Sequence, residues 1–374
     1  MTATAGKERK GARNGSIELL RFLTAVGVAG VHFTQAYRPG TGRFECITVM
    51  MEFFFMLTGF FMMKSILAET PERPGLPACD AVLYSFRKGK ALFLPYIVAV
   101  LLCFVVRQAT SAEFTWAKCF GELFHFKWEY LMLHLAGFTP DPKFGVDYLM
   151  GPGWFLSAML IALVPAYYLA KKHRENYAGV IAPLSAMGIY FYIMQNYGTL
   201  DVGNQLAGVA MLGTLRAFAG ISVGAFCCQI AGWVKRSGLK ERSRAWDIAN
   251  VLSWGAVALL PVLDYKWFPR PDVLFWVLPL GFLILSADLG RGVVSNAIAR
   301  RSGKGVATLG KLSMYLYLFH APLMLAWRAV VPPVHLWING IAYIAVSVLL
   351  GAGMMVLHGR LTARKAARER ATGV

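Results

Sequence analysis

Residues Phe44–Met63 read FECITVMMEFFFMLTGFFMM, a run that is apolar apart from two glutamates and two threonines. As a helix, a run of this length spans the hydrocarbon core of a bilayer. Further runs of this kind predict an all-α polytopic membrane protein of about ten transmembrane helices. The ten segments are Ile17–Tyr37, Phe44–Met63, Ala91–Val106, Trp154–Ala170, Ala178–Gln195, Leu206–Gly232, Trp246–Asp264, Asp272–Asp288, Gly305–Trp327 and His335–Leu357.

The composition of the 374-residue chain supports the same class. Hydrophobic residues make up 57% and charged residues 16%, with a mean hydropathy of +0.51. Soluble domains carry about 25% charged residues, so the composition argues against an ordinary cytosolic enzyme. The net charge of +18 would suggest nucleic acid for a soluble protein. In a membrane protein it is explained by basic cytoplasmic loops, and we expect no nucleic-acid partner.

The distribution of Lys and Arg predicts the orientation. With the N-terminus inside, the inner segments hold 26 Lys and Arg residues and the outer segments hold 9. This asymmetry places both termini in the cytoplasm. The chain then divides into a basic tail at 1–16, a ten-helix domain at 17–357 and a second basic tail at 358–374. Within the domain, 108–153 is an aromatic extracytoplasmic loop or a re-entrant segment, suited to meeting an acceptor.

Ionisable residues inside the spans indicate a functional site, because they are costly in lipid. Arg21 and His32 lie eleven residues apart in the first span, on one helix face and about 16 Å apart along the axis. His32 could act as a general base, or it could be a hydrogen-bonded packing residue. Arg21 could serve a ligand, pair with Glu18 one turn away, or extend to the headgroups.

Glu52 stands in an aromatic run of the second span and is therefore protonated or paired with a cation. The functional interpretation is that it orients His32. Arg216 is in mid-span without a nearby acid in the sequence, and His320 is at mid-depth of the ninth span. Thr58-Gly59 lets helices approach closely.

A basic segment, Arg87, Lys88 and Lys90, precedes the third apolar run. These cations either set topology or hold a phosphorylated cytosolic ligand. The six cysteines form no C-x-x-C pair and no His lies at ligand spacing, so we expect no metal. The sequence also lacks P-loop, G-x-S-x-G and H-E-x-x-H motifs, so hydrolase and NTPase classes are unsupported.

Several segments together resemble the acyltransferase-3 family of integral membrane O-acyltransferases. Arg21 and His32 match its Arg-x10-His, and Glu52–Phe61 matches its acidic-aromatic segment with Thr58 for serine. The other matching segments are Arg87–Tyr96, Trp154–Ser157 and Gly310–Pro322. Lys88 and Lys90 depart from the commoner arginines, and lysine cannot form a bidentate fork with phosphate.

The resemblance implies transfer of an acyl group, most often acetyl, from cytosolic acyl-CoA to a hydroxyl of a surface polysaccharide, glycolipid or precursor. The implied setting is a bacterial plasma membrane. His32 would be the general base with Glu52 as its partner, and a transient acyl-histidine is an alternative. Arg21, Arg87, Lys88 and Lys90 would bind CoA phosphates. Substrate or oxyanion contacts would come from Arg216, Tyr315, His320 and Trp154.

Two other classes remain open. A multi-span transporter or flippase of an amphiphilic anionic substrate would also bury Arg and His in broken helices. That class predicts internal repeats, and none is found between the first five and last five spans. A membrane sensor would use the 108–153 loop to bind an extracellular ligand.

Overall fold

The computed structural model describes residues 14–38, 45–69, 76–110, 150–202, 205–207, 210–238, 243–261 and 276–372. The predicted aromatic loop therefore lies outside the described residues except at its two ends. The helices are α1 (Gly15–Tyr37), α2 (Met51–Ala68), α3 (Pro77–Thr110), α6 (Trp154–Asn176), α7 (Ala182–Tyr197), α8 (Leu212–Arg236), α9 (Arg244–Leu259), α10 (Leu278–Leu289), α11 (Val293–Arg301), α12 (Lys304–Val330) and α13 (Leu336–Thr372). Short elements are η1 (Glu45–Met50), η3 (Gly151–Gly153), η4 (Tyr177–Ile181), β1 (Leu206–Ala207) and β2 (Ala210–Met211).

The protein is a helical, multi-pass membrane protein. Among the described residues, six helical segments are long and apolar enough to cross a bilayer, and a seventh results if the bent pair α10–α11 counts as one span. Each of the ten predicted segments overlaps a helix of the described chain, although several of these helices are too short or too polar to qualify as a span alone. The predicted start of the sixth span was wrong: α8 begins at Leu212, because Leu206–Ala207 and Ala210–Met211 pair as two short antiparallel strands. An apolar run indicates a buried segment, but the residues at its ends can form either a helix or a strand, and the pattern does not distinguish the two.

Close approach of α2 and α8 forms the centre of the bundle. A Cβ at Gly59 would lie 1.9 Å from the Ile221 carbonyl oxygen, and one at Gly224 would lie 1.8 Å from that of Met56. Only glycine permits backbones this close, as small residues do in membrane helix pairs. The packing role predicted for Thr58-Gly59 is confirmed at Gly59.

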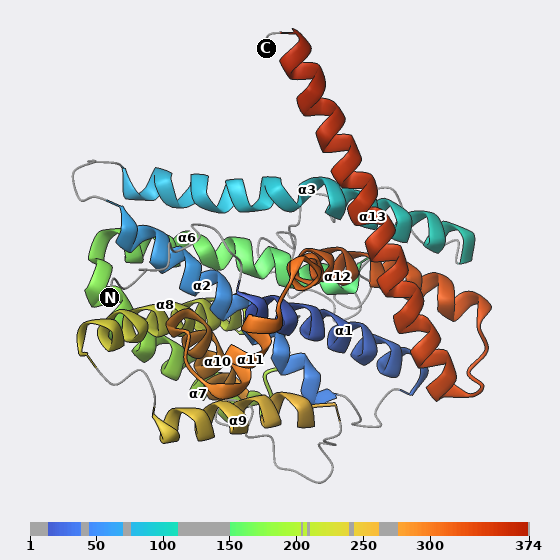
Figure 1. Ribbon diagram of the computed structural model, residues 1–374. Coiled ribbons are helices and arrows are strands. Elements are labelled where there is room, and N and C mark those ends of the chain that lie inside the picture. The colour runs from blue at the N-terminus through green and yellow to red at the C-terminus, as the bar shows by residue number, and fades with distance from the viewer. Residues whose placement is uncertain are drawn as a thin grey trace, which may run out of the picture.

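Helices α1, α12 and α13 form a second contact group (Figure 1). Glu18 of α1 packs against Gly310 near the start of α12, and the Tyr37 hydroxyl donates to the carbonyl oxygens of Trp327 and Val331 near its end. The two helices are therefore parallel, since they contact each other near their first turns and again near their last turns. By contrast α13 is antiparallel to α12, and its C-terminal part projects from the bundle (Figure 1). The predicted tail at 358–374 continues this helix as far as Thr372.

Helix α3 starts fourteen residues before the apolar run that predicted it, at Pro77. The basic segment Arg87–Lys90 thus lies inside a helix. Helix α3 packs against α6, where the Ser85 hydroxyl donates to the Leu160 carbonyl at 2.7 Å. Helix α6 turns into η4 and α7 at Arg174, whose φ of 40° breaks the helical path.

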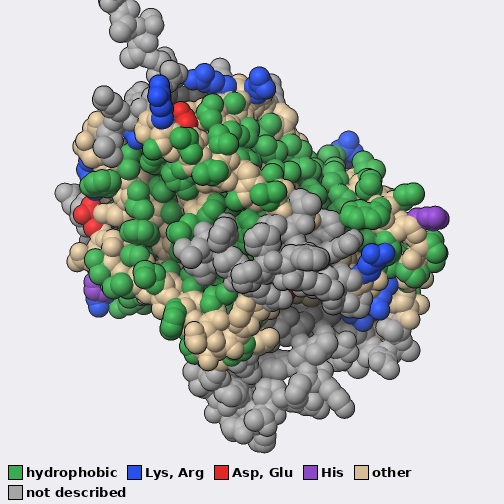
Figure 2. Space-filling model, turned by 90° about the horizontal axis from the view of Figure 1, so that it is seen from below, with side chains coloured by type: hydrophobic (Ala, Val, Ile, Leu, Met, Phe, Trp, Pro, Cys, Tyr) green, Lys and Arg blue, Asp and Glu red, His purple; other side chains and the backbone are tan. Residues whose placement is uncertain are grey.

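The surface agrees with a lipid environment. In Figure 2 hydrophobic side chains cover most of the described area of one face, and the charged ones lie toward its margin. Large exposed apolar side chains occur on several helices, among them Phe191, Ile341 and Leu349. In water such a surface would be unfavourable, whereas acyl chains can cover it.

Candidate functional site

His32 of α1 meets His320 of α12. The two rings stack with centroids 5.2 Å apart and an interplanar angle of 21°. His320 is fully buried and His32 is half-buried, so His32 is the more accessible of the two. Because α1 and α12 pack in parallel, the two histidines come into contact although they are 288 positions apart in the sequence.

The surroundings of His320 fix its ring. Its Nδ1 lies 3.3 Å from the Leu316 carbonyl oxygen, and its own carbonyl accepts from the Tyr343 hydroxyl at 3.0 Å. The Tyr317 ring lies 5.9 Å away, and the Tyr317 hydroxyl donates to the Pro152 carbonyl at 2.5 Å. His320 Nε2 is buried and has no hydrogen-bond partner in the described part of the chain. A buried nitrogen without a partner is unfavourable and indicates a position that a ligand or water can fill.

A cationic group lies at the other end of α1. Arg21 Nη1 is 3.4 Å from Glu18 Oε2, which is the pairing expected for residues one turn apart. Lys88 of α3 lies close enough to Arg21 for their charges to interact, and its Nζ is 5.7 Å from the Tyr84 ring centroid. Arg87 and Lys90 are exposed. Arg21 and Lys88 thus lie on two different helices within electrostatic range of each other.

Glu52 and Arg216 form a buried ion pair between α2 and α8, with both side chains fully buried. The other Glu52 oxygen accepts from the Tyr190 hydroxyl at 2.6 Å. The carboxylate is thus paired with a cation, one of the two states expected for it. The sequence alone predicts His32 as the functional partner of Glu52, whereas the structure pairs Glu52 with Arg216.

Arg216 also connects several elements. Its Nη1 donates to the Leu200 carbonyl at 2.6 Å and its Nη2 to the Thr48 carbonyl at 2.9 Å. Its Cζ lies 5.6 Å from the Trp154 ring centroid. One guanidinium thereby holds together α2, α8, η1 and the loop after α7. This geometry suits positioning, because directed N–H groups and a stacked ring fix a side chain well.

Asp201 lies within electrostatic range of both the His32–His320 pair and the Glu52–Arg216 pair. The sequence alone did not single it out. Its charge interacts with both His32 and Arg216, and its side chain is exposed. A lone acid in a loop gives no sequence signal of its own. Its position 15 residues before Arg216, a cation in mid-span, was the available clue. Tyr190 was also missed, since a tyrosine in an apolar run resembles ordinary packing.

Two further predicted site residues have clear contacts. The Tyr315 hydroxyl hydrogen-bonds to His358 Nδ1 at 2.6 Å, and Trp154 packs edge-on against Phe155 besides contacting Arg216. Among the described residues no group of three or more His, Cys, Asp or Glu side chains could hold a metal ion.

The comparison with protein families decides the class. A model of an acyltransferase domain matches residues 14–358, nearly the whole chain. The chain belongs to the acyltransferase-3 family. It is therefore an acyltransferase, and its matched region includes α1 with His32 and α12 with His320. Comparisons with curated proteins and with solved structures found no match.

Proposed function

We propose that this acyltransferase moves an acyl group, acetyl in the first instance, from cytosolic acyl-CoA to a hydroxyl of a surface polysaccharide, glycolipid or its precursor. His32 is the general base in this proposal. The observation that carries it is the stacked His32–His320 pair, reached along the α1 face that begins at Arg21. A half-buried imidazole at a helix contact inside a membrane domain has access to substrate and is shielded from bulk water.

The orientation belongs to the same proposal: ten spans with both termini in the cytoplasm of a bacterial cell. The helix directions support it. In an alternating ten-span chain the first and ninth spans are parallel, as α1 and α12 are. The second and sixth spans of such a chain are also parallel, and so are α2 and α8. Glu52 contacts Arg216, and further along both helices Met56 contacts Gly224.

The transfer proceeds through the thioester carbonyl. His32 takes the proton of the acceptor hydroxyl while the hydroxyl oxygen attacks the carbonyl carbon. The tetrahedral intermediate collapses with breakage of the C–S bond, and the departing thiolate receives the proton from His32. The products are an ester and free CoA. Two stacked imidazolium ions would repel each other, so His320 stays neutral while His32 carries the proton.

The donor enters from the end of α1 where Arg21 and Lys88 lie. Their charges suit the phosphates of CoA, and the exposed Arg87 and Lys90 extend the basic surface. The separation of about 16 Å between Arg21 and His32 along α1 leaves room for an extended pantetheine arm. Trp154 and Tyr315 remain candidates for acceptor contacts.

Glu52 and Arg216 act in this proposal by holding the bundle around the site. Arg216 already donates to three protein acceptors. Its use as an oxyanion donor would require one of its remaining N–H groups to face the substrate.

The decisive experiment is acetyl-CoA turnover by the detergent-purified full chain, with and without crude cell-envelope glycan. Wild type is compared with His32→Ala, and His173→Ala is the matched control because His173 is exposed on α6. We expect the His32 variant to lose about 10²- to 10⁴-fold in turnover and to keep its CoA affinity. The His173 variant should match wild type.

Glycan-stimulated turnover that requires His32 supports the transferase. Lost CoA binding with preserved chemistry would contradict the general-base role. Failure of a folded protein to turn over several acyl donors would favour the transporter.

A further inference from the structure

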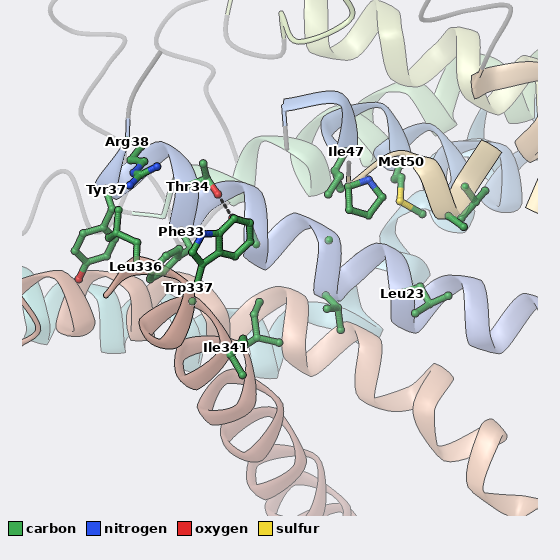
Figure 3. Close-up of a pocket in the computed structure, with 18 of the residues that line it drawn as sticks. Leu23, Phe33, Thr34, Tyr37, Arg38, Ile47, Met50, Leu336, Trp337 and Ile341 are labelled. Atoms are coloured by element: carbon green, nitrogen blue, oxygen red, sulfur yellow. Dashed lines mark hydrogen bonds between the residues drawn. The ribbon is translucent and has the colours of Figure 1, made fainter. Parts of the chain in front are cut away.

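A cavity of about 620 Å³ lies between α1, η1, α9 and α13. Its walls are almost entirely apolar and include Leu23, Gly30, Phe33, Trp254, Ile341 and Ile344. The volume is that of a small-molecule or lipid-chain site. Figure 3 shows the side chains of α1 and α13 converging on it, with Leu23 at one end and Tyr37 and Arg38 at the other.

The groove is separate from the candidate active site. Its α1 residues Leu23, Gly27, Gly30 and Thr34 recur at helical spacing and occupy one face. His32 is two residues from Gly30, a rotation of about 200° around the helix axis. The histidine pair and the groove therefore lie on opposite sides of α1.

The end of the groove opposite to Leu23 is cationic and has the character of a membrane interface. Arg38 lines it and is exposed. Arg328, also exposed, directly follows Trp327, whose carbonyl accepts from the Tyr37 hydroxyl at 3.3 Å. Trp337 lines the same end with 66% of its surface exposed. Tyrosine and tryptophan gather at the headgroup level of bilayers, which is also the level of the lipid phosphates that two arginines would bind.

The length of the groove suits a lipid chain. Along α1 it extends from Leu23 to Arg38, about 22 Å at the rise of an α-helix. One leaflet contributes about 15 Å of hydrocarbon. The groove is therefore long enough to hold the hydrocarbon of one leaflet for a lipid whose phosphate lies at the level of Arg38.

We propose that this groove binds an anionic glycerophospholipid, with one acyl chain along the Leu23–Phe33 face of α1 and the phosphate at Arg38 and Arg328. In the orientation proposed above the lipid belongs to the outer leaflet. Its binding does not require the transfer reaction, and the two are tested by different measurements.

Gly30 provides a clean way to fill the groove. A Cβ built there meets nothing within 4 Å, and Gly30 lines the cavity, so we expect the side chain of Gly30→Leu to extend into the cavity. Gly188 of α7 also has open space at its Cβ and is exposed outside the groove. Gly188→Leu is thus the matched control. Arg38→Gln with Arg328→Gln removes the two charges.

The probes are dioleoyl phosphatidylglycerol and dioleoylglycerol, which carry the same chains with and without the phosphate. Native mass spectrometry of the full chain in detergent counts the bound molecules. We expect wild type and Gly188→Leu to retain phosphatidylglycerol and Gly30→Leu to bind about tenfold more weakly. The affinity of the double arginine variant for phosphatidylglycerol should fall about 10- to 30-fold at low salt, because each of the two charges contributes about 1 kcal/mol.

Equal retention by wild type and Gly30→Leu would overturn the proposal, and so would equal binding of dioleoylglycerol and phosphatidylglycerol. Protein dimers that disappear in Gly30→Leu would assign the groove to a second copy of the chain instead. Binding that needs both the open groove and the arginines would establish the lipid site, whatever the turnover assay gives.

Discussion

The Glu52–Arg216 cluster and the His32–His320 cluster both bury polar groups, and they do so in opposite ways. Arg216 has a carboxylate, two carbonyls and an aromatic ring around it, and Glu52 has a second donor in Tyr190. His320 has a buried Nε2 without a partner in the described chain, beside a half-buried His32. A closed network holds helices in place. An incomplete one leaves room for a reacting group.

The largest effect on stability is expected from breaking the closed network. Arg216→Met leaves the Glu52 carboxylate buried without its cation and should cost about 3–5 kcal/mol of unfolding free energy. Thermal unfolding in detergent measures this. The double variant Glu52→Gln, Arg216→Met should regain part of the loss, because no buried charge then remains unpaired. If Arg216→Met were as stable as the double variant, the buried Glu52 carboxylate would not need its cation, and the Glu52–Arg216 cluster would not be a stabilising closed network.

A smaller and different effect is expected at the incomplete cluster. His320→Gln removes the ring stacked on His32 and keeps a polar side chain. We expect turnover to fall about tenfold, equivalent to about 1.4 kcal/mol of activation energy. The unfolding temperature should change little, since a stacked ring pair contributes only about 0.5–1.5 kcal/mol. Turnover and unfolding are measured on one preparation. A variant that unfolds early and turns over normally would assign His320 to packing.

The smallest effect is expected at Asp201, whose charge acts on both clusters. Asp201→Asn should lower turnover by about two- to fivefold, within the range of a solvent-exposed ion pair. Because exposed charges are screened by salt, the difference from wild type should shrink between about 0.05 M and 0.5 M salt. A loss that persists unchanged at high salt would mean that Asp201 contacts the substrate directly.

Local sequence patterns predicted more of the fold than of the site. Twenty-residue apolar runs form helices because an unpaired backbone group is costly in lipid, so each run predicted a helix. The start of α3 at Pro77 escaped prediction because its first turns precede the apolar run. The strands at 206–207 and 210–211 escaped because they lie inside an apolar run that also fits the start of a helix. Arg21 and His32 were singled out because charge inside a span is rare.

The sequence by itself determined the membrane class, the helical segments, the family and the residues worth testing. Only the tertiary structure decided which of those residues meet: Arg216 with Glu52 across 164 positions, His320 with His32 across 288, and a groove on the opposite side of α1. The physical reason is that helix formation depends on neighbours within a few turns. A buried carboxylate, in contrast, accepts any cation that helix packing brings within reach, and the spacing of residues along the chain does not specify which one.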